Sequence, residues 1–196
     1  RKDVQVIIIV PTRELAQQIE SVFKQMGTAF KINCCYGGHS VQIERNNLLE
    51  PPAVLVGTPG RIAHHIRKKT LNIATANYLI LDEFDKSLEV GFEEDMKFII
   101  ENLTAVTKKV LTSATQKVKI PPFVGIKNPK RLSYLDNKTQ NLKLKTVVSQ
   151  TKDKLASLEK LLGHIGNGSG IIFCNFAVLN WGIKPTQYRF IFLNRQ

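Results

Sequence analysis

Short apolar runs that alternate with helical patterns constrain the fold of this chain more than any other feature. Residues 4–10 are nearly all apolar, as in a strand that is buried on both faces of a parallel sheet. The next segment, residues 14–26, repeats apolar side chains at helical spacing, which predicts a helix. Further strands are predicted at 32–36, 53–56, 78–81 and 109–112, and further helices at 61–68 and 93–103. Repeated strand–turn–helix units imply right-handed crossovers, so we expect an α/β fold with a doubly wound parallel sheet.

The composition changes in the second half of the chain. The 196 residues, 43% of them hydrophobic, suffice for one α/β domain or for one domain and part of another. Residues 121–141 are rich in Lys, Asn and Pro, whereas leucines at 155–162 predict a helix and residues 171–173 a strand. We therefore expect a first domain at 1–135, a linker at 136–150 and the start of a second domain at 151–196. Arg1 in place of a start methionine suggests a piece of a longer protein.

The formal net charge of +12 indicates a polyanionic partner, most simply nucleic acid, although solubility alone is the alternative. Seven acids nevertheless gather between residues 82 and 95. No apolar stretch approaches the ~18–20 residues of a membrane span. Cys34, Cys35 and Cys174 lack metal-ligand spacing and are interpreted as buried reduced thiols, which favours an intracellular, cytoplasmic location.

The tetrad Asp82-Glu83-Phe84-Asp85 follows the predicted strand 78–81 directly. Ligands of open α/β sheets bind at the carboxyl ends of the strands. One carboxylate there can hold Mg²⁺ on a nucleotide phosphate, while its neighbour orients or deprotonates a water molecule. The alternative is an acidic turn or a helix start, because Asp and Glu favour helix N-termini.

Three other turns between a strand and a helix carry residues suited to anions. Pro11-Thr12-Arg13, Gly37-Gly38 and Thr58-Pro59-Gly60-Arg61 combine small residues, backbone N–H groups and guanidinium groups. Such helix N-termini are anion sites that could bind successive phosphates of one strand. Each turn could instead only cap its helix, with Arg61 paired to a nearby acid.

These segments, together with Ser113-Ala114-Thr115, closely resemble in order and spacing the first RecA-like domain of DEAD-box ATP-dependent RNA helicases. The run Ile171-Ile172-Phe173-Cys174-Asn175 resembles the motif that opens the second RecA-like domain, so the resemblance covers about residues 4–176. It implies ATP-dependent unwinding or remodelling of RNA by the parent protein, with ATP and Mg²⁺ as cofactors. RNA would be bound through its sugar-phosphate backbone, without readout of bases.

The resemblance also implies roles for single residues. Asp82 matches the residue that holds Mg²⁺, usually through water, and Glu83 matches the residue that orients or deprotonates the attacking water. Asp85, Ser113 and Thr115 match the residues that couple the nucleotide site to RNA. The RNA-binding residues implied are Pro11, Thr12, Arg13, Gly38, Thr58, Pro59, Gly60 and Arg61.

The chain departs from the family pattern in three places. Gly-x-x-x-x-Gly-Lys-Ser/Thr, the P-loop that cradles phosphates, is absent from residues 1–196, and residues 177–196 lack the arginine-bearing motifs. Phe84 replaces the family's alanine. We therefore expect this chain alone not to hydrolyse ATP appreciably, and apolar surface to be exposed where the family's first strand and helix would pack. The alternatives are a non-catalytic nucleic-acid-binding module, an inert remnant, or a DNA helicase of another superfamily.

Several other polar and aromatic residues are expected to have structural rather than binding roles. His64 and His65, near several basic residues, are expected to form a solvated helix end rather than a ligand pair. Tyr36, Phe92 and Trp181 are expected in or near the core rather than stacked on bases.

Overall fold

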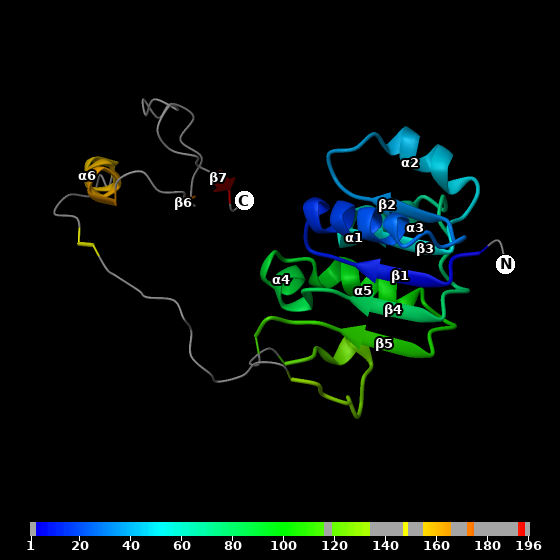
Figure 1. Cartoon of the computed structure of the whole chain (residues 1–196). Helices are drawn as coiled ribbons and strands as arrows, with labels where there is room; N and C mark the ends of the chain where they lie inside the picture. Colours follow the sequence, from blue (N-terminus) through cyan, green and yellow to red (C-terminus); the bar gives the residue numbers. More distant parts are fainter. Residues whose placement is uncertain are drawn as a thin grey trace. The chain divides into compact units, whose positions relative to one another are not determined.

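The computed structural model describes residues 3–115, 119–133, 147–148, 155–165, 172–174 and 192–194. The chain divides into two compact units, Arg1–Leu132 and Ser133–Gln196, and each is described by itself (Figure 1). The predicted domain limits at 135 and 151, and the linker between them, stay predictions.

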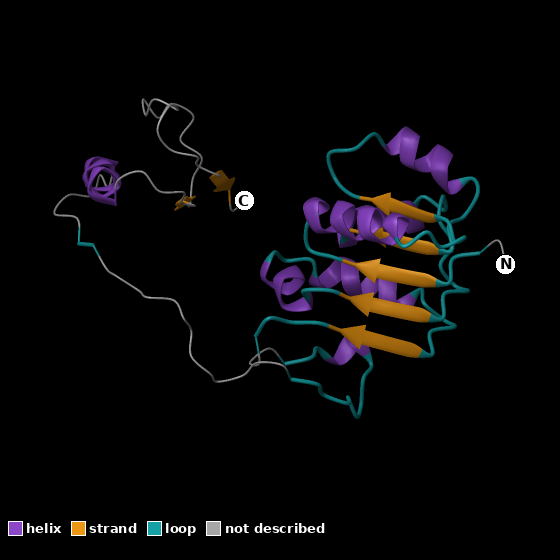
Figure 2. Ribbon diagram, in the orientation of Figure 1, coloured by secondary structure: helices purple, strands orange, loops and turns teal. Residues whose placement is uncertain are grey.

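The first unit is built on a five-stranded sheet in which all strands are parallel (Figure 2). The strands are β1 (Val6–Ile9), β2 (Ile32–Cys35), β3 (Val54–Gly57), β4 (Tyr78–Leu81) and β5 (Lys108–Leu111), in the order β2-β3-β1-β4-β5. The predicted parallel α/β sheet is therefore confirmed. Because every strand runs the same way, all five carboxyl ends meet at one edge.

Helices cover both faces of this sheet (Figure 1). The helices of this unit are α1 (Arg13–Gln25), α2 (Val41–Leu48), α3 (Pro59–Arg67), α4 (Phe84–Glu89) and α5 (Glu93–Glu101), followed by the 3₁₀ turn η1 (Pro122–Val124). Helix α1 packs on one face through β2 and β3, whereas α3 and α5 pack together on the other. Helix α1 begins at a Thr12 cap, whose hydroxyl accepts the Leu15 N–H.

Helix α2 was not predicted, and α4 was expected only as the alternative of a helix start at the acidic tetrad. Helix α2 is polar over most of its length and buries only Glu44 and Leu48, so it lacks the apolar repeat that marks a helix. Helix α4 has only six residues and lies within the acidic run, which we interpreted as a site. Both are held by tertiary contacts rather than by local pattern.

The core is split by the sheet into two layers. The larger layer packs Leu55 and Leu79 against α3 and α5, and the smaller one surrounds Ala16 of α1. Phe84 is only 5% exposed and belongs to the larger layer, so its ring fills core space at the position where the family pattern has alanine. Tyr78 on β4 and Val110 on β5 are about half exposed. The expected exposure of apolar surface beside the family's first strand and helix stays a prediction.

The second unit contains α6 (Leu155–Ile165), β6 (Ile172–Cys174) and β7 (Phe192–Asn194) among its described residues. The predicted helix and the strand after it are confirmed, and β6 pairs with β7 in parallel. Ile171, Asn175 and Trp181 lie outside the described residues, as does the side chain of Cys174. Within the described segments, no helix combines the length and the apolar character that crossing a bilayer requires.

The buried strand β4 predicts a clear difference between two substitutions. Leu79→Ala should lower the free energy of unfolding of the first unit by about 2–5 kcal/mol, because Leu79 is fully buried and alanine leaves a cavity. Val110→Ala, the matched control on β5, should cost less than about 1 kcal/mol because half of that side chain is already exposed. Urea denaturation followed by circular dichroism measures both, and equal losses would contradict this core assignment.

Candidate functional site

The acidic tetrad forms a tight turn at the carboxyl end of β4. The Asp82 N–H donates to the Ile9 carbonyl of the neighbouring strand β1 at 2.9 Å, which continues the sheet pairing by one residue. Glu83 then adopts a left-handed conformation, with φ of 46° and ψ of 48°, which is uncommon for any residue except glycine. Strained backbone of this kind is kept only where the surroundings hold it, and it concentrates at functional sites.

Thr112, the residue after β5, holds this turn. Its hydroxyl accepts the Glu83 N–H at 3.0 Å and donates to Asp82 Oδ1. Its backbone carbonyl accepts the Phe84 N–H at 3.2 Å. Thr112 was not among the site residues predicted from the sequence. The signal for it is its place at the end of the predicted strand at 109–112: Leu81 pairs with Leu111, so the residues that follow them lie side by side.

The structure brings Asp85, Ser113 and Thr115 together, as the resemblance implies. Asp85 is 1% exposed, and its Oδ2 accepts the Thr115 hydroxyl at 3.1 Å. Ser113 accepts the Thr115 N–H at 3.0 Å, so it orders the segment that reaches Asp85. Asp85 Oδ1 is buried and has no hydrogen-bond partner among the residues that the structure describes. That oxygen is placed to accept a donor.

The predicted phosphate turns meet at the ends of β1, β2 and β3. A Cβ added at Gly38 would lie 3.5 Å from Arg13 Nη1, so the arginine lies directly over this glycine. Gly38 has a φ of 82°, which favours glycine. The exposed Arg13 donates to Glu14 at 2.7 Å, and this hydrogen bond raises the pKa of Arg13 and lowers the pKa of Glu14.

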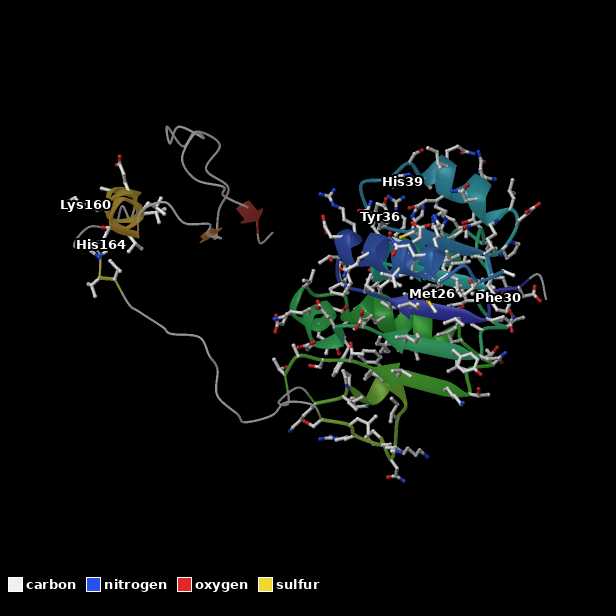
Figure 3. The ribbon with its side chains drawn as sticks, in the orientation of Figure 1. Met26, Phe30, Tyr36, His39, Lys160 and His164 are labelled. Carbon is white, nitrogen blue, oxygen red and sulfur yellow. The ribbon has the colours of Figure 1, made fainter. Side chains whose placement is uncertain are left out.

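Arg61, in the first turn of α3, contacts the loop at residues 37–39. Its Nη2 donates to the His39 carbonyl at 3.1 Å, and its Nε lies 3.6 Å from Glu44 Oε2. The alternative of a pairing with a nearby acid is therefore realised. Figure 3 shows Tyr36 and His39 close together at the end of β2, beside α2, and their ring centroids are 5.6 Å apart.

A shallow pocket opens beside Arg61. It has a volume of about 340 Å³ and is lined by Gly37, Thr58, Gly60, Arg61, His64 and Phe92. The lining includes residues of two predicted phosphate turns. It also includes His64 and Phe92, for which the sequence predicted no binding role. Tyr36 and Phe92 are half-buried, as expected. Pro11 and Pro59 are buried, so these turns face solvent through other members, chiefly Thr12, Arg13 and Gly38.

Glu44 is a buried carboxylate at the centre of this region. It is 1% exposed, accepts the Tyr36 N–H at 3.1 Å and lies 2.8 Å from His65 Nε2. The expectation of a solvated histidine pair is wrong for His65, which is 1% exposed and also contacts the Thr70 hydroxyl through Nδ1 at 2.8 Å. Sequence reasoning missed the reason, because the partners Glu44 and His65 are 21 positions apart.

Glu44 and His65, with Cys35, have ligand atoms within 4.8 Å of one another, a geometry that a metal ion could use. The carboxylate already has hydrogen-bond donors, however, and a guanidinium lies 3.6 Å away. A divalent cation would have to displace or face that positive charge. We therefore interpret the cluster as a hydrogen-bonded network.

The comparisons with known proteins agree with this geometry. The family model described as DEAD/DEAH box helicase matches residues 1–121. The chain belongs to the DEAD/DEAH box helicase family. It is 36% identical over 184 residues to the ATP-dependent RNA helicase eIF4A of Emericella nidulans, a match that covers 89% of this chain and 46% of the relative. It is 35% identical over 179 residues to the chloroplastic DEAD-box ATP-dependent RNA helicase 3B of Zea mays, covering 86% and 24%.

Solved structures place the fold of this DEAD-box chain in the RecA-like class. A DEAD box protein from Methanococcus jannaschii matches with a TM-score of 0.55 and 36% identity, covering 58% of this chain and 32% of that one. A hypothetical ATP-dependent RNA helicase from Sulfolobus tokodaii matches with a TM-score of 0.55 and 28% identity, covering 62% and 36%. The chain thus spans less than half the length of these relatives.

The DEAD-box acids fit Mg²⁺, whereas this chain offers little for the phosphates of ATP. Asp82 and Glu83 present carboxylate oxygens, the ligands that Mg²⁺ prefers. Asp82 Oδ1 accepts the Thr112 hydroxyl, so Oδ2 would be the oxygen available to Mg²⁺ or to its water. Residues 1–196 contain no P-loop sequence, so no backbone cradle for a triphosphate is formed from them by that motif.

The thiols of the DEAD-box chain behave as predicted where they are described. Cys34 is half-buried, Cys35 is buried, and both are free. Burial, with a smaller effect of the Glu20 charge, raises the pKa of Cys34 to about 12. Burial, with a smaller effect of the Glu44 charge, also raises the pKa of Cys35. Both thiols therefore stay protonated near neutral pH.

The contacts of Thr112 predict a local loss of order on Thr112→Val. Valine keeps the shape but removes the hydroxyl, so the Glu83 N–H loses its acceptor and should exchange with solvent faster. The free energy of unfolding should fall by about 0.5–1.5 kcal/mol, the usual net value of such a bond.

Thr104→Val is the control, because its hydroxyl donates to the Ala74 carbonyl in another loop. Hydrogen exchange by NMR reports each amide. Unchanged exchange at Glu83 in Thr112→Val would show that the acidic turn does not depend on this hydroxyl.

Proposed function

We propose that this chain supplies the metal- and water-handling acids and part of the RNA-binding surface of an ATP-dependent RNA helicase. In the whole protein, ATP hydrolysis would drive the unwinding or remodelling of RNA duplexes. Membership of the DEAD/DEAH box family and relatives named as RNA helicases support this function. The single observation in the chain that carries it is the bridge from the end of β5 to the acids: Thr112 to Asp82 and Thr115 to Asp85.

The acids would act in distinct roles. Asp82 would hold Mg²⁺ through water, while the exposed Glu83 would orient or deprotonate the attacking water. Mg²⁺, when bound, neutralises charge that develops on the transferred phosphoryl group. Asp85 is buried, so it suits a coupling role better than a chemical one: a shift at the acidic turn would move Thr115, and Ser113 with it.

RNA would lie along the ends of β1, β2 and β3. Thr12, Arg13, Gly38 and the turn that ends at Arg61 offer backbone N–H groups and guanidinium groups, which bind phosphates without distinguishing bases. The net charge of +12 supports a polyanionic partner. Sequence-independent binding and a cytoplasmic location are part of this proposal.

Residues 1–196 alone should not hydrolyse ATP appreciably, because no P-loop sequence is present to hold the triphosphate. With RNA, ATP and Mg²⁺, phosphate release in a malachite-green assay should be no faster than that of Glu83→Gln, the matched variant. RNA-stimulated release that Glu83→Gln abolishes would overturn this expectation. A non-catalytic nucleic-acid-binding module is the second candidate function, favoured because the phosphate turns need no P-loop.

RNA binding should be electrostatic and should depend on Arg13. Arg13→Gln should weaken binding of a single-stranded oligoribonucleotide several-fold, and the slope of log K against log salt should become shallower by about 1, because one phosphate contact is lost. Arg131→Gln removes the same charge from an exposed position outside the turns and is the control.

Fluorescence anisotropy at four salt concentrations measures both variants. If Arg13→Gln and Arg131→Gln weaken binding equally, Arg13 contributes only positive charge and not a specific phosphate contact. If the unaltered chain binds no RNA, the RNA-binding proposal is rejected.

A further inference from the structure

We propose that Glu44 is a positioning residue for RNA: its buried carboxylate fixes Arg61 and the loop at 37–39 in the arrangement that receives a phosphate. This inference rests on the RNA-binding function proposed above. It assigns a role to a residue of α2, a helix that contributes no other residue to the proposed site.

The first support is the burial of Glu44. A carboxylate that is 1% exposed is costly unless donors surround it, so its donors must be held in place for the fold to be stable. Its partners come from two other elements. The Tyr36 N–H lies just after β2, whereas His65, which is hydrogen-bonded to Glu44, and Arg61, which is ion-paired with it, belong to α3; Glu44 itself lies on α2. The carboxylate therefore fixes the loop after β2 against the first turns of α3.

The second support is the geometry of Arg61. Its Nε faces Glu44 at 3.6 Å and its Nη2 donates to the His39 carbonyl at 3.1 Å. These two contacts fix the plane of the guanidinium, whose side chain is 14% exposed and lines the pocket with Gly37 and Gly60. Among the described residues, Nη1 has no hydrogen-bond or ion-pair partner, so in this proposal it is the atom that binds the phosphate. An arginine that is already ordered loses less side-chain entropy on binding.

The third support is the arrangement of the loop itself. Gly38 lies under Arg13, and His39 supplies the carbonyl that Arg61 binds. His39 Nδ1 is buried and lies 3.7 Å from Glu44 Oε1, so the carboxylate also faces this side of the loop. One carboxylate thus holds the loop that lies between the two arginines of the proposed RNA surface.

Charge and position predict opposite results for Glu44→Gln. The substitution removes one negative charge beside a site for a polyanion, so charge alone predicts tighter RNA binding. Positioning predicts weaker binding, because Arg61 and the loop lose their common partner. The sign of the change in affinity therefore separates the two accounts.

The experiment measures binding of a fluorescent single-stranded oligoribonucleotide to the full 196-residue chain by anisotropy over a range of salt. Glu44→Gln should weaken binding about three- to tenfold, in the range of one lost phosphate contact, and make the salt slope shallower by about 1. The double variant with Arg61→Gln should bind less weakly than the two single losses combined predict, because both changes remove the contact between Glu44 and Arg61. Glu50→Gln, an exposed glutamate just after α2, is the matched control and should not weaken binding.

Circular dichroism first establishes that each variant folds. If Glu44→Gln does not fold, Glu44→Asp replaces it: the charge stays but the carboxylate no longer reaches Arg61, so positioning still predicts weaker binding and charge predicts no change.

The inference is overturned, while RNA binding stands, if Glu44→Gln (or Glu44→Asp in its place) binds RNA as tightly as Glu50→Gln. It is also overturned if the loss of RNA affinity caused by this substitution adds fully to the loss caused by Arg61→Gln. If the unaltered chain binds no RNA, the proposed function fails and the inference fails with it.

Discussion

The parallel pairing of five strands is the constraint on which the rest of this structure depends. Ile9 pairs with Gly57 on one side and with Leu81 on the other, so β1, β3 and β4 end at the same level. The residues that follow these strands therefore lie along one edge whatever their separation in sequence. Thr12 and Arg13, Thr58 to Arg61, and the acidic tetrad reach that edge for this reason, and not through local sequence.

Two hydrogen-bonded groups organise that edge on either side of β1. On the side of β4 and β5, Thr112 and Thr115 fix the acids. On the side of β3 and β2, Glu44 gathers the Tyr36 N–H, His65 and Arg61. In the first group, Glu83 is exposed and Asp82 is half-buried, which is consistent with the proposed roles of these acids toward Mg²⁺ and water. The second is buried, which suits residues that hold others in place.

Much of the fold could be predicted from the sequence because the strands are apolar and the helices carry regular repeats. The residue types at the end of each strand, and the resemblance they support, also located the candidate site. The remaining features depend on tertiary contacts that no local pattern encodes. Helix α2 is held by the contacts that its buried Glu44 makes with Tyr36, His65 and Arg61. His65 is buried beside a partner on another element, and Thr112 lies beside the acidic turn because Leu81 pairs with Leu111. Phe84 replaces a small residue, and only the structure shows that the core holds its ring.

The most direct measurement of the central claim is photo-crosslinking of a short RNA that contains 4-thiouridine, followed by mass spectrometry of the crosslinked peptides. RNA bound at the carboxyl edge should mark peptides that contain Arg13, Gly38 or Arg61. The loops at the opposite edge, residues 27–31, 72–77 and 104–107, are an internal control in the same molecule. Crosslinks concentrated in those loops would contradict the account, because they would place the nucleic acid at the wrong ends of the strands.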